Sequence, residues 1–139
     1  MSTPGFAVDT SVAVPLILRT HPAHDAVTAW AADKRLCLSG HAAAETYSVM
    51  TRLPAPVRAT GQDVARAMDD AFSEVLALPA KIAASVHQEL ASHEISGGAT
   101  YDALVALAAR ENNMTLATRD ARAQGTYETV GAVAFLLLT

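Results

Sequence analysis

Short apolar segments alternate with longer helical segments along this chain, and this alternation constrains the fold more than any other feature. Each apolar segment has the length of a buried strand rather than of a helix. Strands that alternate with helices imply right-handed crossovers and a mainly parallel sheet. We therefore predict an α/β fold with helices on both faces of a central sheet of five strands. The expected strands are 6–8, 36–38, 75–78, 115–118 and 132–137.

Helical periodicity fills most of the intervening sequence. The first helix is expected from Ser11, with Pro15 near its start, where the missing N–H is tolerated. Another begins after Ser39-Gly40-His41 and carries Glu45. Further helices are expected at 24–34, 61–71, 80–93 and 100–111.

Length, cysteine content and net charge limit the class of protein. A length of 139 residues suits one domain, so 1–139 is expected to form a single unit. The lone Cys37 excludes a disulfide-stapled scaffold, and neither a signal peptide nor an apolar run long enough to span a membrane is visible. We expect a cytoplasmic protein. The net charge of -4 argues against non-specific duplex binding, which depends on excess Lys and Arg.

Four acidic residues lie where strands end or helices begin. Asp9 ends the first strand, Glu45 and Asp102 lie in the first turns of two helices, and Asp120 closely follows the fourth strand. In open α/β sheets such positions meet beyond the carboxyl ends of the strands. Taken singly, Glu45 and Asp102 could be ordinary helix-start acids and Asp120 a turn residue. Asp9 is more informative because a carboxylate after a buried strand is costly without a partner.

Clustered carboxylates have a clear chemical use. They raise one another's pKa unless a cation lies between them, and their hard oxygens suit Mg²⁺ or Mn²⁺. Such ions can orient an attacking water and stabilise the leaving oxygen in phosphodiester cleavage. Without these four acids the formal charge of -4 would become zero, so the negative balance could be local to one metal site.

The four acids also carry a family resemblance. The opening Phe-Ala-Val-Asp-Thr-Ser at 6–11 resembles that of PIN-domain nucleases, in particular VapC-type toxins of bacterial toxin–antitoxin pairs. The segments 44–47 (Ala-Glu-Thr-Tyr), 101–108 (Tyr-Asp-Ala-Leu-Val-Ala-Leu-Ala) and 116–120 (Leu-Ala-Thr-Arg-Asp) resemble the family's second, third and fourth acidic motifs, in order.

This resemblance implies a PIN domain that acts as a Mg²⁺- or Mn²⁺-dependent endoribonuclease. By family analogy Asp9, Asp102 and Asp120 would be metal ligands, and Glu45 would bind the metal or position water. The hydroxyls of Ser11 and Thr118 would support the site. The resemblance also implies an RNA substrate and a VapB-like antitoxin. We further expect a homodimer, since alanine-rich helices leave little charge to resist association.

Some features leave alternatives open. Arg119 could contact a substrate phosphate or pair with one of the acids, and His41 could be a capping residue or touch substrate. The segment 121–128 is less hydrophobic than in typical family members, so the path to the last strand is unassigned. Two other functions stay open: a metal-dependent phosphoesterase for a small substrate, favoured by a closed pocket, and a non-catalytic binding module.

Overall fold

Five short strands form one sheet at the centre of the computed structural model, which describes residues 5–138. All neighbours in the sheet are parallel, in the order β3-β2-β1-β4-β5. The predicted parallel α/β architecture is confirmed, and every expected strand is present. The strands are β1 (Gly5–Val8), β2 (Arg35–Ser39), β3 (Glu74–Leu76), β4 (Leu116–Thr118) and β5 (Ala134–Leu136).

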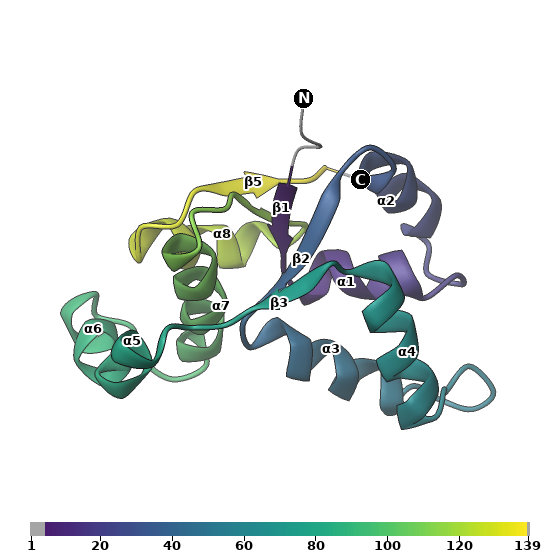
Figure 1. Cartoon of the computed structure of the whole chain (residues 1–139), viewed down its shortest axis with the longest axis horizontal. Coiled ribbons are helices and arrows are strands. Elements are labelled where there is room, and N and C mark those ends of the chain that lie inside the picture. The colour runs from purple at the N-terminus through teal and green to yellow at the C-terminus, as the bar shows by residue number, and fades with distance from the viewer. Residues whose placement is uncertain (1–4, 139) are drawn as a thin grey trace.

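Helices cover both faces of this sheet. Figure 1 shows α1 to α4 on one side of the strands and α7 and α8 on the other, with α5 and α6 projecting beyond α7. This division follows from right-handed crossovers, because the chain moves outward from β1 in one direction and then in the other. The helices are α1 (Thr10–Ile17), α2 (His24–Ala31), α3 (Ala42–Thr51), α4 (Gly61–Ala71), α5 (Ala80–Ala84), α6 (Val86–Ser92), α7 (Ala99–Glu111) and α8 (Ala121–Thr129). No helix within 5–138 combines the length and apolar character needed to cross a membrane.

Two predictions about the helices were wrong: the unbroken helix at 80–93 and the place of Pro15 within the first helix. The expected helix at 80–93 is divided at Ser85, whose hydroxyl donates a hydrogen bond to the Lys81 carbonyl and competes with the regular backbone pattern. Pro15 lies inside α1 rather than near its start. Because proline has no N–H, it cannot donate the usual helical hydrogen bond to the carbonyl of Ser11. The guanidinium of Arg119 donates to that carbonyl instead, at 3.2 Å.

The unassigned segment 121–128 forms most of α8. Its hydrophobicity is low because it buries only Ala123 and Tyr127. Its start is fixed by Asp120, whose carboxylate accepts hydrogen bonds from the backbone N–H groups of Arg122 and Ala123.

Small side chains bring α7 close to the rest of the core. Ala103, Ala106 and Ala108 on this helix are completely buried. The turn between β2 and α3 lies against α7 at Gly40, which has a positive φ of 54°. A Cβ at this position would lie 2.9 Å from the Cβ of Ala108. Gly40 is therefore required both by backbone conformation and by close contact, and it sets the spacing between α3 and α7.

An aromatic cluster joins α2 to the sheet. The Trp30 ring meets Phe6 of β1 edge-on, with centroids 5.3 Å apart, and stacks on Phe135 of β5 at 6.4 Å. The ammonium group of Lys34 lies 4.8 Å from the centroid of the Trp30 ring. The cluster holds α2 against β1, the central strand, and β5, an edge strand.

Candidate active site

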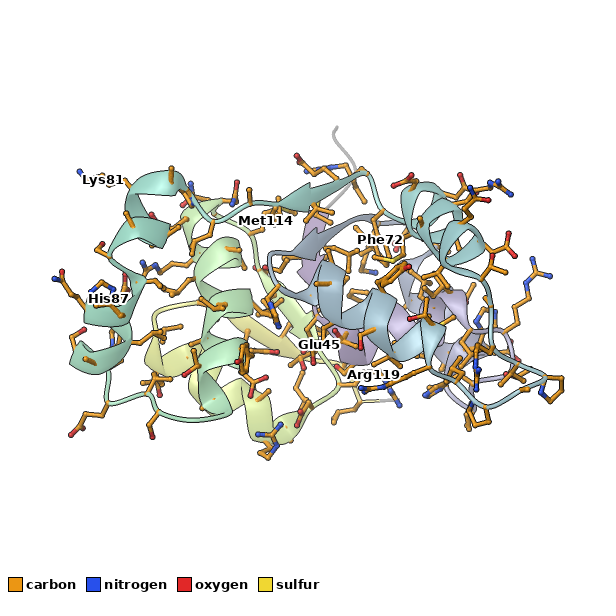
Figure 2. All side chains as sticks on the ribbon, turned by 90° about the horizontal axis from the view of Figure 1, so that it is seen from below. Glu45, Phe72, Lys81, His87, Met114 and Arg119 are labelled. Atoms are coloured by element: carbon orange, nitrogen blue, oxygen red, sulfur yellow. The ribbon has the colours of Figure 1, made fainter. Side chains whose placement is uncertain are left out.

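The structure brings the four predicted acids together. Asp9, Glu45, Asp102 and Asp120 line one cavity of about 90 Å³ at the carboxyl edge of the sheet. They come from the end of β1, from α3, from α7 and from the residues between β4 and α8. Figure 2 shows Glu45 near the middle of the molecule, whereas Lys81 and His87 lie on the projecting helices. The remaining lining residues are Thr10, Ser11, Arg122 and Tyr127.

Asp9 is the buried centre of this site. Asp9 is only 4 % exposed, and although it precedes α1, its carboxylate accepts no capping hydrogen bond from the backbone N–H groups of that helix. Instead Oδ1 accepts a hydrogen bond from the Ser11 hydroxyl at 2.6 Å. Oδ2 accepts two, from Thr118 at 2.5 Å and from Tyr127 at 2.8 Å. A capping role therefore does not explain Asp9, whereas precise positioning of its carboxylate does.

The hydroxyls of Ser11 and Thr118 both contact the Asp9 carboxylate. Besides donating to Asp9, Ser11 Oγ accepts a hydrogen bond from the backbone N–H of Arg119, and Thr118 Oγ1 accepts one from that of Asp120. Both hydroxyls are thus held by the backbone after β4. They couple the ends of β1 and β4, and the distance between their oxygens is 3.3 Å.

Tyr127 is the site residue that sequence reasoning missed. Its ring is buried on α8, and its phenol contacts Asp9. Burial raises the pKa of Tyr127, and the negative charge of Asp9 raises it further, so the phenol stays a hydrogen-bond donor. The spacing of Asp120, Ala123 and Tyr127 is helical and places them on one face, a signal that was available in the sequence.

Two of the acids carry poorly compensated charge. Burial raises the pKa of Glu45, and Asp102 and Asp9 raise it further, while His41 acts in the opposite direction. Burial also raises the pKa of Asp102, with added repulsion from Asp120 and Asp9, while Arg122 acts in the opposite direction. The cavity therefore favours the approach of a cation.

Two arginines near the site, Arg119 and Arg122, have different contacts. Arg122 is 76 % exposed and extends over the cavity, with Nη2 lying 3.2 Å from Asp120 Oδ2 and Nη1 lying 3.7 Å from Asp102 Oδ2. Arg119 contacts the first turn of α1, where its guanidinium donates to the Ser11 carbonyl and its backbone N–H donates to the Ser11 hydroxyl. Asp120 caps α8 and pairs with Arg122 at the same time. It therefore lines the cavity and also has the local structural role that the sequence left open.

The donor chemistry fits a hard divalent cation. The four acids offer only carboxylate oxygens, which Mg²⁺ and Mn²⁺ prefer, and two of them have raised pKa values. Within residues 5–138, however, no three Asp, Glu, His or Cys side chains converge closely enough to form a complete metal-ligand group. The guanidinium of Arg122 partly neutralises Asp102 and Asp120, as a bound cation would.

A larger groove adjoins the acid cavity. It has a volume of about 470 Å³ and lies between α3 and α7. The groove and the cavity share Glu45, Asp102 and Arg122 in their linings, so the two spaces, together called the recess, are neighbours, and the groove is the larger of them. The groove is lined by His41, Glu45, Ser48, Arg52, Gly98, Tyr101, Asp102 and Arg122.

Comparison with known proteins extends these observations. Residues 6–128 match the model of the PIN domain family. The chain is 55 % identical to Ribonuclease VapC27 of Mycobacterium tuberculosis over 92 % of its own length and 93 % of the relative. It is 45 % identical to Ribonuclease VapC40 of the same species, over 88 % of its own length and 91 % of the relative.

Solved structures share the fold at lower identity. The crystal structure of VapBC2 from Rickettsia felis, bound to a DNA fragment from its promoter, matches with a TM-score of 0.66 and 15 % identity, over 96 % of this chain and 99 % of that one. FitAcB from Neisseria gonorrhoeae matches with a TM-score of 0.63 and 21 % identity, covering 94 % and 96 %. These likenesses concern the fold alone.

Proposed function

The chain belongs to the PIN-domain family and to its VapC ribonucleases, and on this premise we propose that it is a divalent-metal-dependent endoribonuclease toxin neutralised by a cognate antitoxin. The observation that carries this proposal is the convergence of four acids from four separate parts of the chain on one cavity. Helix capping accounts for Asp120 alone, and the mutual repulsion of the carboxylates opposes gathering all four in one place.

The residues have distinct proposed roles. Asp9, Glu45, Asp102 and Asp120 would hold Mg²⁺ or Mn²⁺, which when bound would activate water and stabilise the leaving oxygen of the phosphodiester. Ser11 and Thr118 orient the Asp9 carboxylate through hydrogen bonds.

The arginines have separate tasks. Arg122 lies over the acids and is exposed, so it is the better placed of the two to meet a substrate phosphate when it releases Asp102 and Asp120. Arg119, through its contact with the Ser11 carbonyl, supports the hydroxyl network.

The shape of the recess favours a polymer over a small substrate. The acid cavity of about 90 Å³ is too small to enclose a nucleotide, but it adjoins the groove of about 470 Å³. A chain lying in the groove could present one phosphate to the acids. This supports RNA cleavage over the small-substrate phosphoesterase, and four intact acids argue against a silent binding module.

The partners and location follow from the family. We propose a VapB-like antitoxin, an RNA substrate, a homodimer and action in the cytoplasm, with all of 1–139 forming the single domain. The ribonuclease relatives support these proposals, since the matched region covers nearly their whole length.

Cleavage of total RNA tests the function directly. The antitoxin-free protein is incubated with total RNA in Mg²⁺, in Mn²⁺ and in EDTA, and the products are sequenced from their ends. We expect discrete fragments with metal and intact RNA with EDTA. Asp102→Asn should reduce cleavage at least about 100-fold, as is common when a group acting in the transition state is removed.

Asp69→Asn is the matched control. It makes the same chemical change on the exposed surface of α4, and it should cleave like the wild type. Intact RNA from the folded wild-type protein in both metals would refute the ribonuclease proposal, and equal loss in both variants would refute the assignment of Asp102.

A further inference from the structure

We propose that His41 and Tyr101 form a stacking platform for one unpaired base of the RNA, beside the phosphate that lies over the acids. This inference deepens the ribonuclease function and rests on it. It assigns two residues, His41 and Tyr101, to recognition of the RNA.

The two rings already form a stacked pair. Their centroids are 5.1 Å apart and their planes differ by 27°. Tyr101 is 55 % exposed, more than any other Phe, Tyr or Trp in the part of the chain that the structure describes. An aromatic ring that is fixed by one neighbour and still largely exposed is ready to stack on a further planar group.

The platform is attached to the same helices as the acids. His41 immediately precedes α3, and its carbonyl accepts the hydrogen bond from the backbone N–H of Glu45, so the two residues lie one helical turn apart. Tyr101 immediately precedes Asp102 on α7. The rings are therefore held close in the fold to Glu45 and Asp102, two of the four acids.

The surroundings suit a nucleotide. The groove that contains both rings has a volume of about 470 Å³, within the range of roughly 300–1,000 Å³ typical of small-ligand sites. Arg52 and Arg122 also line it and supply positive charge for a backbone phosphate. A base stacked on the rings, the phosphate beside it and the acids that would act on that phosphate thus have places in the groove and the adjoining cavity.

Stacking also offsets the weak electrostatic attraction between this acidic protein and RNA. The sequence has only 10 Lys and Arg against 14 Asp and Glu, so general attraction to RNA is weak. Stacking on an aromatic ring adds affinity without positive charge and tolerates every base, because each has a π face. A base held in a duplex offers no free face, so single strands and loops are the expected targets.

Variants of Tyr101 test the platform. With a single-stranded RNA taken from the sites cut in total RNA, Tyr101→Ala should raise KM about 5- to 150-fold, the cost of one base–aromatic stack. The change in kcat should be small, since the reacting groups are untouched. Tyr101→Phe keeps the ring and should keep KM close to that of the wild type. His41→Ala tests the other half of the pair and should raise KM in the same direction.

A binding measurement separates stacking from catalysis. The same RNA carrying 2-aminopurine in place of each base next to the cut is mixed with protein in EDTA, where no cleavage occurs. One position should lose fluorescence on binding to the wild type and to Tyr101→Phe, but not to Tyr101→Ala. A wild-type KM and full quenching in Tyr101→Ala would overturn the platform and leave the ribonuclease intact. Failure of the wild type to cut any RNA would overturn the proposed function itself.

Discussion

Asp9 depends on three hydroxyls that reach it from three different elements. Ser11 belongs to α1, Thr118 ends β4 and Tyr127 lies on α8. Hydrogen bonds to a charged group are worth about 1.5–3 kcal/mol each, more than neutral ones. The geometry of the site is therefore tied to the stability of the fold at this residue.

Tyr127→Phe should lower the free energy of unfolding by about 1.5–3 kcal/mol. The phenylalanine ring fills the same space, so the loss comes from the hydrogen bond to Asp9 rather than from a cavity. RNA cleavage should fall as well, because Asp9 gains freedom to move. Denaturant unfolding gives the measurement. The exposed Tyr47→Phe, as control, should stay within about 0.5 kcal/mol, and equal effects at the two sites would contradict this account.

Glu45→Gln should make the metal-free protein more stable while abolishing cleavage. Burial and the neighbouring acids raise the pKa of Glu45, which means that its ionised form costs folding free energy. Since Glu45 is partly exposed, the gain in the variant should be modest, roughly 0.5–1 kcal/mol. Thermal unfolding in EDTA at neutral pH measures it.

The pH dependence of the stability gain in Glu45→Gln tests whether the ionised carboxylate of Glu45 is its cause. The cost of ionised Glu45 is fully present above its raised pKa and disappears as the pH falls through that pKa toward the ordinary value of 4.5. The difference in Tm between variant and wild type should therefore shrink on acidification. Glu128→Gln removes the same charge from an exposed position and should show no such trend. A constant difference across pH for Glu45→Gln would refute the repulsion.

At the level of elements, the width of the recess is set by the contact of the β2–α3 turn with α7. Gly40 and Ala108 meet there, and the two helices carry Glu45 and Asp102. Because the contact is made by backbone and a methyl group, no long side chain can adjust to absorb a change.

Gly40→Ala should destabilise the protein by about 1–3 kcal/mol and reduce cleavage. The new Cβ would lie 2.9 Å from that of Ala108, and the positive φ disfavours any side chain. Gly125→Ala is the control, because it lies inside α8 with no atom within 4 Å of the added Cβ. It should stabilise the protein by about 0.5–1 kcal/mol. Denaturant midpoints compare the two, and similar signs for both would contradict this explanation.

The sequence predicted strands and helices well wherever a local pattern of apolar residues was present. Apolar runs predicted all five strands, and helical spacing predicted most helices. The segment that became α8 was missed because it buries only two residues, and the division at Ser85 depends on one side-chain hydrogen bond. Such effects leave little trace in hydrophobic periodicity.

For the whole molecule, the predicted parallel sheet, the helix starts and the family resemblance together indicated which four acids line one cavity. Asp9, Ser11 and Thr118 are in contact as the motifs suggested. The position of Arg122 over the acids and the stack of His41 on Tyr101 could not be predicted. They depend on how α3, α7 and α8 are rotated about their axes, which is decided by packing across the molecule.

The aromatic cluster on α2 also gives the protein a built-in optical probe. Trp30 is the single tryptophan of the sequence, and it packs on Phe6 and Phe135 rather than on any residue of the acid cavity or its groove. Its emission should follow the loss of packing between α2 and the sheet and stay nearly unchanged when metal or RNA occupies the recess. Intrinsic fluorescence thus reports whether each variant is folded, independently of whether its site is filled.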